Sequence, residues 1–114
     1  MDAAGQASLL EQPPASYHAI LIDSTDFGAA VSLFTDAFFA DARALLRPGG
    51  VLACNVESPS WSLPVVLAVA AQLRRVFAFV SMFQAFVPTY LSGHYAFALA
   101  SNEVDSTIHS PRDV

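Results

Sequence analysis

Ala19 to Ile22 form a wholly apolar run that stops abruptly at four polar residues, Asp23-Ser24-Thr25-Asp26. The run is long enough for a buried strand and too short for a typical helix. In an open α/β sheet, a buried strand that ends in acidic residues commonly opens a ligand site at its carboxyl end. The same four residues could instead only cap the next helix and turn the chain, because Asp, Ser and Thr favour both positions. The spacing alone leaves both interpretations open.

Strand and helix patterns alternate along the rest of the chain. We expect strands over residues 17–22, 51–56, 81 or 82 to 87, and 95–100. With a helix after each of the first two strands, this order predicts an α/β fold with a mostly parallel sheet and a closing antiparallel hairpin. No G-x-G-x-x-G turn occurs, so the chain resembles the second half of a nucleotide-binding Rossmann fold.

Helix boundaries are marked by residues with known preferences. Apolar residues recur at helical spacing between Leu33 and Leu46, with Ser32 or Thr35 as the candidate N-cap. The run Arg47-Pro48-Gly49-Gly50 should end this first helix. We expect the second helix to open at Ser62, with a proline in its first turn, where proline is tolerated.

Composition excludes several classes of partner. The chain is 54% hydrophobic and 13% charged, contains no lysine, and has a formal net charge of -5. These values argue against nucleic acid and against an anionic membrane, and they suit a cationic ligand. Polar residues interrupt the apolar stretch 63–80, and no signal peptide is visible, so we expect no membrane span and a cytoplasmic protein. The single Cys54 predicts a core residue and no zinc or other metal site.

Three stretches carry a resemblance to a known family: YHAILIDSTD, LFTDAFFADARALLRPGGVLACNVESP and FVPTYLSGHYAFALAS. In this order and at this spacing they resemble the polyamine aminopropyltransferases, the spermidine synthase family, over about Tyr17 to Ser101. The resemblance implies a methyltransferase-like Rossmann fold and a role in polyamine biosynthesis. The implied reaction moves an aminopropyl group from the co-substrate decarboxylated S-adenosylmethionine to putrescine or a similar amine, with no other cofactor. It also implies a possible homodimer.

The resemblance implies a set of site residues. Asp23 matches the family's proton acceptor, and Asp26 matches a second carboxylate that binds the amine. A carboxylate within hydrogen-bond reach of a protonated amine can hold it and accept its proton as a general base. Tyr90 matches a tyrosine that holds the amine, and Asn55 stands where the family commonly has glutamine. The other implied positions are Ser24 and Thr25 in the same turn, and Asp2 and Ala3, which match the place of the family's acidic pair that contacts adenine.

Other residues receive structural interpretations. We expect Glu57 to be a solvated residue at a strand end and Trp61 to pack rather than bind. Phe77, Phe79, Phe83 and Phe86 are expected in the core rather than on a surface that stacks a ligand.

The chain also departs from the family pattern. The loop after Asp26 lacks the usual prolines, and Leu91 replaces the proline after the site tyrosine. The family's N-terminal β-strand domain, glycine-rich turn and ribose-binding acid are absent. We therefore expect an N-terminal segment (1–16), a partial catalytic domain (17–101) and a loose polar tail (102–114), together a fragment that is inactive alone. The alternative is a catalytically inactive remnant that binds a full-length synthase or another partner.

Overall fold

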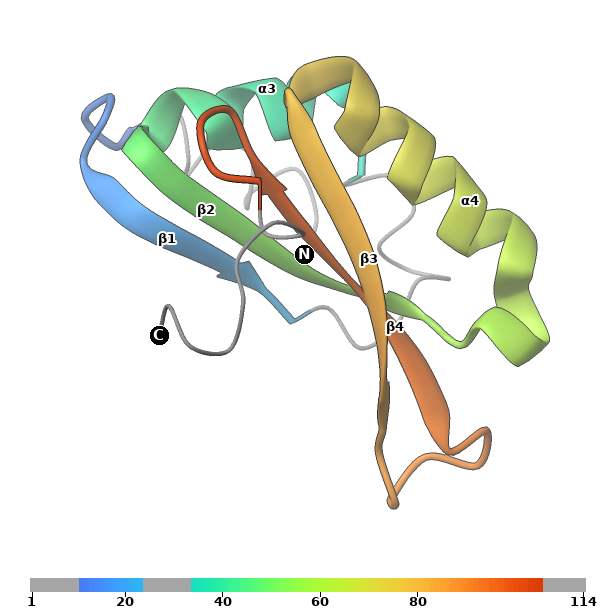
Figure 1. Cartoon of the computed structure of the whole chain (residues 1–114). Helices are drawn as coiled ribbons and strands as arrows, with labels where there is room; N and C mark the ends of the chain where they lie inside the picture. The colour runs from blue at the N-terminus through green and yellow to red at the C-terminus, as the bar shows by residue number, and fades with distance from the viewer. Residues whose placement is uncertain (1–10, 24–33, 106–114) are drawn as a thin grey trace.

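A single sheet organises the chain in the computed structural model, which describes residues 11–23 and 34–105. Its strands, in the order β1-β2-β4-β3 across the sheet (Figure 1), are β1 (Tyr17–Ile22), β2 (Leu46–Glu57), β3 (Phe79–Phe86) and β4 (His94–Ser101). β1 is parallel to β2, whereas β4 is antiparallel to both β2 and β3. β1, β2 and β3 therefore point the same way, and β3 and β4 form the closing antiparallel hairpin. This arrangement confirms the predicted fold class.

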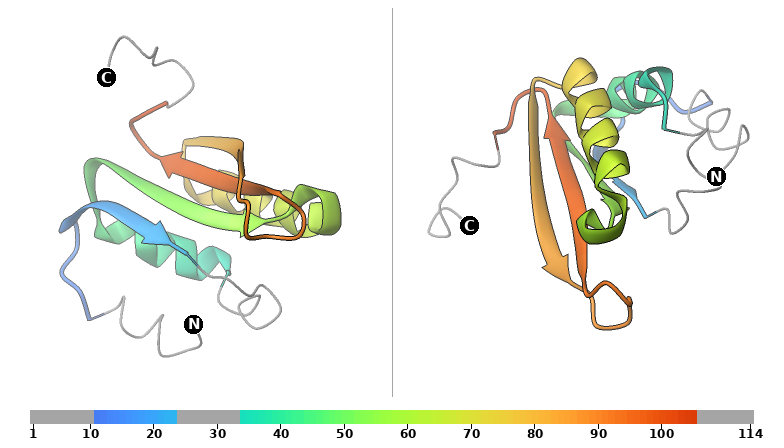
Figure 2. Two further views of the ribbon diagram at one scale, coloured as in Figure 1. Left: turned by 90° about the horizontal axis from the view of Figure 1, so that it is seen from below. Right: turned by 90° about the vertical axis from the view of Figure 1, so that its right-hand side faces the viewer.

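Two helices of the described segments, α3 (Asp36–Leu45) and α4 (Pro59–Val76), contact each other and cover the same face of the sheet (Figure 2). Thr35 is the N-cap of α3, and its hydroxyl accepts a hydrogen bond from the Phe38 N–H at 3.0 Å. This bond satisfies one of the backbone donors that the first helical turn leaves free. Neither helix is long and apolar enough to cross a membrane.

The second helix begins earlier than the sequence predicted. α4 starts at Pro59 and breaks at Ser62, whose backbone angles (φ -139°, ψ 43°) are not helical. Pro64 lies inside the helix, where it has no N–H to donate and its ring crowds the preceding turn. The expected start at Ser62 therefore marks a kink between a first short turn and the main body of the helix.

β2 also begins earlier than predicted. α3 does end at Leu45, but β2 starts at Leu46 and includes the segment 47–50 that was expected only to stop the helix. This first part of the strand is irregular. Gly49 has a positive φ of 79°, and the pairing register with β1 shifts between Tyr17 and Ala19. A proline-glycine pair can therefore join the strand only at its irregular start, where ladder hydrogen bonds are already interrupted.

The hydrophobic core lies between the sheet and the two helices. Alternate residues of β2 and β4 face this core, because successive side chains of a strand point to opposite faces. Cys54 is among them, as predicted, and its burial raises the pKa of the thiol to about 12. The core side chains are Phe38, Phe39 and Ala42 from α3, Val66, Val69 and Leu73 from α4, Leu52, Cys54 and Val56 from β2, and Ala96, Ala98 and Ala100 from β4.

The phenylalanines around β3 correct a prediction. Phe77 is buried, but Phe79, Phe83 and Phe86 are 38%, 46% and 64% exposed. Phe79 and Phe83 lie on the sheet face opposite α3 and α4, because the alternate residues of β3 pack against the core. The ring of Phe83 stacks on that of Phe97, with centroids 5.3 Å apart. These rings therefore form part of the open face of the sheet.

Candidate active site

The carboxyl ends of β1 and β2 bring Asp23 and Asn55 together. The two strands are parallel and pair Ile22 with Cys54, so the next residue of each strand lies at the same edge of the sheet. The Asn55 side-chain N–H donates to the Asp23 carboxylate, with 3.4 Å between Nδ2 and Oδ1. Asn55 is 6% exposed, whereas Asp23 is open to solvent. A buried amide therefore orients an accessible carboxylate.

Asp23, Asn55 and Tyr90 line one cavity of about 340 Å³, here called the Asp23 cavity. Three residues that the sequence marked as site residues are thus brought together by β1, β2 and the turn after β3. Among the residues that the structure describes, none that lines this cavity is an arginine, lysine or histidine. The remaining lining is apolar: Leu21, Ile22, Ala53, Cys54, Phe83, Val87 and Phe97.

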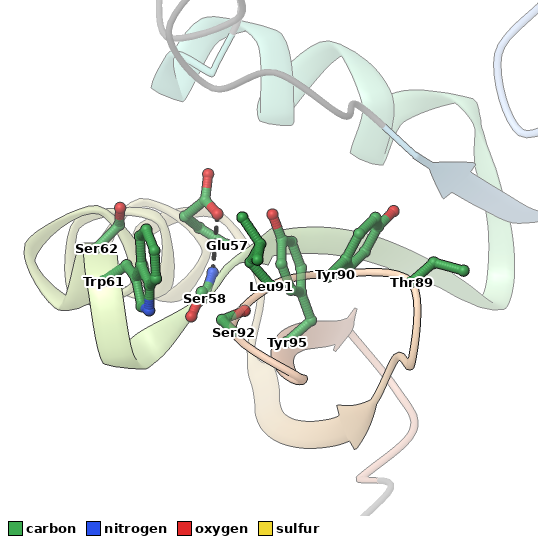
Figure 3. Close-up of a pocket in the computed structure, with 9 residues that line it drawn as sticks. All are labelled: Glu57, Ser58, Trp61, Ser62, Thr89, Tyr90, Leu91, Ser92 and Tyr95. Atoms are coloured by element: carbon green, nitrogen blue, oxygen red, sulfur yellow. Dashed lines mark hydrogen bonds between the residues drawn. The ribbon is translucent and has the colours of Figure 1, made fainter.

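A second cavity, of about 330 Å³, lies beside Glu57 and is here called the Glu57 cavity (Figure 3). Tyr90 lines both cavities. In Figure 3 the Glu57 carboxylate and the hydroxyl ends of Tyr90 and Tyr95 point in the same direction. The described lining of this cavity also has no cationic side chain: Glu57, Ser58, Trp61, Ser62, Thr89, Tyr90, Leu91, Ser92 and Tyr95.

A β-bulge in β2 separates the two cavities. Asn55 pairs with Phe97 of β4, and Glu57 pairs with the adjacent Ala96, so Val56 is the extra residue. A bulge of this kind interrupts the regular alternation and re-aims the side chains that follow it. Asn55 consequently lines the Asp23 cavity, whereas Glu57 lines its neighbour.

The Glu57 carboxylate is held by a backbone hydrogen bond and lies in the same cavity as Tyr95. The backbone N–H of Ser58 donates to Glu57 Oε1 at 2.9 Å. Hydrogen bonding with Glu57 is also the largest of the effects that raise the pKa of Tyr95 to about 12, followed by burial and by the charges of Glu57 and Tyr90. Tyr95 therefore stays protonated, and remains a donor, across the physiological range.

Two buried polar atoms in the described part of the chain have no hydrogen-bond partner, and each belongs to a residue that lines one of these cavities. They are Asn55 Oδ1 and Ser58 Oγ. A buried acceptor without a partner is costly, and it gains free energy when a ligand supplies a donor. Both cavities can accordingly take a hydrogen-bond donor, and their acidic and aromatic lining favours a cationic one.

The structure tests the sequence-predicted set only in part. It brings Asp23, Asn55 and Tyr90 together, whereas Ser24, Thr25, Asp26, Asp2 and Ala3 lie outside the described residues. Sequence reasoning missed Glu57, expected to be a solvated strand end, and it missed Tyr95 entirely. Trp61, expected to pack, lines the Glu57 cavity and is 72% exposed. Glu57 could have been predicted as a site residue because it lies two residues after Asn55, at the same end of β2.

The fold places the chain in the methyltransferase-like Rossmann class. Human methyltransferase-like protein 13 in complex with SAH is similar with a TM-score of 0.62 at 17% identity, over 96% of this chain and 50% of that one. The sequence model of the spermine/spermidine synthase domain matches residues 4–110, and the chain belongs to this family. The family membership predicted from the three sequence stretches is thereby confirmed.

Individual relatives agree with this family. A polyamine aminopropyltransferase of Nitrosomonas europaea is 40% identical over 87 residues, which cover 75% of this chain and 26% of the relative. Spermidine synthase 1 of Hyoscyamus niger is 37% identical over 101 residues, which cover 87% of this chain and 32% of the relative. A crystal structure of spermidine synthase in complex with the transition state analogue AdoDATO has a TM-score of 0.87 at 25% identity, over 100% of this chain and 40% of that one. The chain thus spans about a quarter to a third of the length of these curated relatives.

Proposed function

We propose that this chain is the amine-binding part of an aminopropyltransferase of polyamine biosynthesis. The longer protein would transfer an aminopropyl group from decarboxylated S-adenosylmethionine to putrescine or a similar amine. The observation that carries the proposal is the Asp23 cavity, which gathers a carboxylate, a buried amide and a tyrosine, with no cationic side chain among the described residues that line it. Relatives named polyamine aminopropyltransferase and spermidine synthase support the same reaction.

The chemistry follows from the state of the acceptor. An alkyl ammonium group has no free electron pair, so it must lose a proton before it can attack. Asp23 would hold the ammonium and accept that proton as the general base. The freed nitrogen then attacks the aminopropyl carbon bound to the sulfonium. As the new carbon–nitrogen bond forms, the carbon–sulfur bond breaks and its electron pair returns to sulfur, which leaves neutral methylthioadenosine.

The neighbouring side chains have distinct roles in this proposal. Asn55 would orient the Asp23 carboxylate through its N–H and accept from the ammonium through Oδ1, which has no partner within the described ranges. The Tyr90 hydroxyl would hold the amine at the wall that both cavities share. Ser24, Thr25 and Asp26 would complete the amine site, and Asp2 and Ala3 would contact adenine. For these five residues the proposal rests on the sequence resemblance alone.

Glu57 extends the proposed site beyond the residues that the sequence marked. Its carboxylate lies in the neighbouring cavity together with aromatic side chains, a combination that favours an ammonium ion. A diamine with one ammonium at Asp23 and the other at Glu57 would use both cavities. Tyr90 lines both and would contact the methylene chain between the two charges.

The proposal is tested by Asp23→Asn in the longer protein that contains this sequence. The substitution keeps the size of the side chain but removes the base, so turnover should fall by about 100- to 10,000-fold. Glu103→Gln makes the same carboxylate-to-amide change beyond the end of β4 and should leave the rate unchanged. The measurement is methylthioadenosine release. An unchanged rate in the Asp23 variant, with the fold verified by circular dichroism, would refute the assignment.

A second candidate function is supported by the exposed edge strand β1. Leu21 is 78% exposed on β1, an edge strand of the described sheet that has no charged or proline residue. Unprotected apolar edges favour pairing with another chain. The chain would then be a catalytically inactive remnant that binds a full-length synthase. Capture of a purified full-length synthase by the tagged chain would favour this function, and no capture at micromolar concentrations would count against it.

Assembly and location belong to the same proposal. A homodimer of the longer protein and a cytoplasmic location are what the family resemblance and the composition predict. Sedimentation velocity of the longer protein tests the first, and fluorescence microscopy of a tagged protein tests the second.

A further inference from the structure

Tyr95 lies against both halves of the proposed amine site, although no role was predicted for it from the sequence. It lies in β4, pairs with Ala85 of β3, and lines the Glu57 cavity. Its ring centroid lies 4.5 Å from that of Tyr90, with the two planes inclined by 44°. Tyr95 lines this cavity together with Glu57, and the proximity of the Glu57 carboxylate raises the pKa of its hydroxyl. Tyr95 thus contacts Tyr90, which lines both cavities, and lies beside the Glu57 carboxylate in the Glu57 cavity.

We propose that Tyr95 is a positioning residue that couples the two cavities into one site for an amine with two ammonium groups. Its hydroxyl holds the Glu57 carboxylate for the second ammonium, and its ring sets the orientation of Tyr90. This inference rests on the proposed amine-binding function. It adds Tyr95 to the site and gives separate roles to its hydroxyl and its ring.

The hydroxyl is needed because the bulge leaves Glu57 with few constraints. The bulge at Val56 interrupts the pairing of β2 with β4 directly before Glu57. The Ser58 N–H anchors Oε1 alone, and a carboxylate held at one oxygen can still rotate. Hydrogen bonding with Tyr95, from the neighbouring strand, adds a second direction. Because the raised pKa of Tyr95 keeps its hydroxyl protonated, this donor persists wherever an amine is charged.

The ring is needed because Tyr90 lies in a turn. Backbone hydrogen bonds fix the chain there, from Tyr90 N–H to the Val87 carbonyl (3.0 Å) and from Gly93 N–H to the Tyr90 carbonyl (2.9 Å). They do not fix the direction of the side chain, which is 36% exposed. The contact with the Tyr95 ring supplies that constraint, since aromatic rings at this distance attract each other. The wall between the two cavities therefore depends on Tyr95.

Two substitutions separate the two roles. Tyr95→Phe keeps the ring against Tyr90 and removes the hydroxyl from Glu57, whereas Tyr95→Leu removes both. Tyr17→Phe is the matched control, because its hydroxyl interacts with Gln12 and lies in neither cavity. The probes are putrescine, which carries two ammonium groups, and 1-aminobutane, which has the same carbon chain and one. Dissociation constants for the 114-residue chain are measured by chemical-shift titration.

Tyr95→Phe should weaken putrescine binding about fivefold, the size of one lost hydrogen bond to a charged group near the surface, and should leave 1-aminobutane unchanged. Tyr95→Leu should weaken both amines, and Tyr17→Phe neither. Equal effects of Tyr95→Phe on the two amines, or no effect on either, would overturn the inference while leaving the proposed function standing. A wild-type chain that binds neither amine at millimolar concentration would overturn both.

A second measurement needs no ligand. The ionisation of the three tyrosines is followed by ultraviolet difference spectra over the pH range in which circular dichroism shows a folded chain. Glu57→Gln should lower the highest tyrosine pKa, because it removes the charge that holds the Tyr95 proton. An unchanged highest pKa would show that Tyr95 does not interact with Glu57 and would overturn the positioning role.

Discussion

The Asn55 amide donates to the Asp23 carboxylate across the ends of two parallel strands, with 3.4 Å between the donor nitrogen and the acceptor oxygen. The contact depends on the register of β1 against β2, because a slip by one residue would move Asn55 to the other face of the sheet. It also leaves Asn55 Oδ1 buried and without a partner in the described segments. The pair therefore combines an oriented base with an unused acceptor at one edge of the sheet.

Replacing the amide with a carboxylate should destabilise the fold in a pH-dependent way. Asn55→Asp places a second negative charge in a buried position beside Asp23, which should lower the free energy of unfolding by about 1–3 kcal/mol at pH 7. Burial and the adjacent charge raise the pKa of the new carboxyl above its unfolded value, so the folded state takes up a proton first as the pH falls. The deficit relative to wild type should shrink below about pH 5.

Urea denaturation at pH 7 and pH 4.5 measures this deficit, with Asn102→Asp as the control. Asn102 is exposed, and its Oδ1 accepts from the Ala78 N–H at 3.1 Å, a role that a carboxylate also fills. The control should therefore be neutral at both pH values. Equal stability of the two variants at pH 7 would contradict a buried contact between Asn55 and Asp23.

A side chain at Gly93 should strain the hairpin turn and displace the exposed ring of Phe86. The φ of Gly93 is +73°, and a Cβ there would lie 2.9 Å from Cε2 of Phe86. Gly49 has a similar φ of +79° but nothing within 4 Å of the corresponding position. Gly49→Ala should therefore cost only the backbone strain, about 1–2 kcal/mol, and Gly93→Ala should cost more.

Thermal unfolding and the putrescine titration together check the Gly93 prediction. The Gly93 N–H donates to the Tyr90 carbonyl, so displacement of the turn should also weaken amine binding in Gly93→Ala but not in Gly49→Ala. A Gly93→Ala chain with wild-type affinity and a melting temperature equal to that of Gly49→Ala would show that the turn adapts without moving Tyr90.

Local signals in the sequence were enough to predict several elements. The bounds of β1 and the Thr35 cap follow from a short apolar run and from a hydroxyl residue before an apolar repeat. Asp23 was marked by its place after an apolar strand, and Asn55 and Tyr90 were marked through the family resemblance. The role of each residue in catalysis stays a prediction.

Properties that depend on tertiary pairing could not be predicted. The bulge at Val56 arises from the pairing of β2 with β4, and no residue type in β2 marks it, so Glu57 was taken for a solvated strand end. The exposure of Phe79 and Phe83 depends on which sheet face the helices cover. The start of α4 was misplaced because Pro59 and Pro64 both suit a first helical turn, and the chain uses the earlier one.

The isolated chain should bind the nucleoside donor poorly. The family's glycine-rich turn and ribose-binding acid are missing from the sequence, and the chain spans 26% to 36% of the curated relatives. Calorimetry with decarboxylated S-adenosylmethionine should therefore detect no micromolar binding to the 114-residue chain. Micromolar binding would mean that the residues present suffice for the donor, and the fragment interpretation would have to be abandoned.

An exposed ion pair joins the two helices and should make their packing sensitive to acid. Arg75 of α4 donates to both carboxylate oxygens of Asp36 of α3, Nε to Oδ2 at 3.0 Å and Nη2 to Oδ1 at 2.9 Å. Hydrogen bonding with Arg75 is the main cause that lowers the pKa of Asp36 below its ordinary value. The unfolded chain therefore binds this proton first as the pH falls, so the stabilisation is present above about pH 4 and is lost as the pH falls through the folded pKa.

Urea midpoints of wild type and Asp36→Asn should accordingly differ at pH 7 and converge as the pH falls through the folded pKa of Asp36. In 1 M NaCl the difference at pH 7 should shrink, because salt screens exposed charges. Arg75→Gln should reproduce the loss, and the double variant should add little to either single change, since both remove the same pair. Arg74→Gln, the same change at the neighbouring exposed arginine, is the control and should leave the midpoint unchanged. A difference between wild type and Asp36→Asn that does not shrink as the pH falls below about 4 would mean that Asp36 stabilises α3 by other means than its charge.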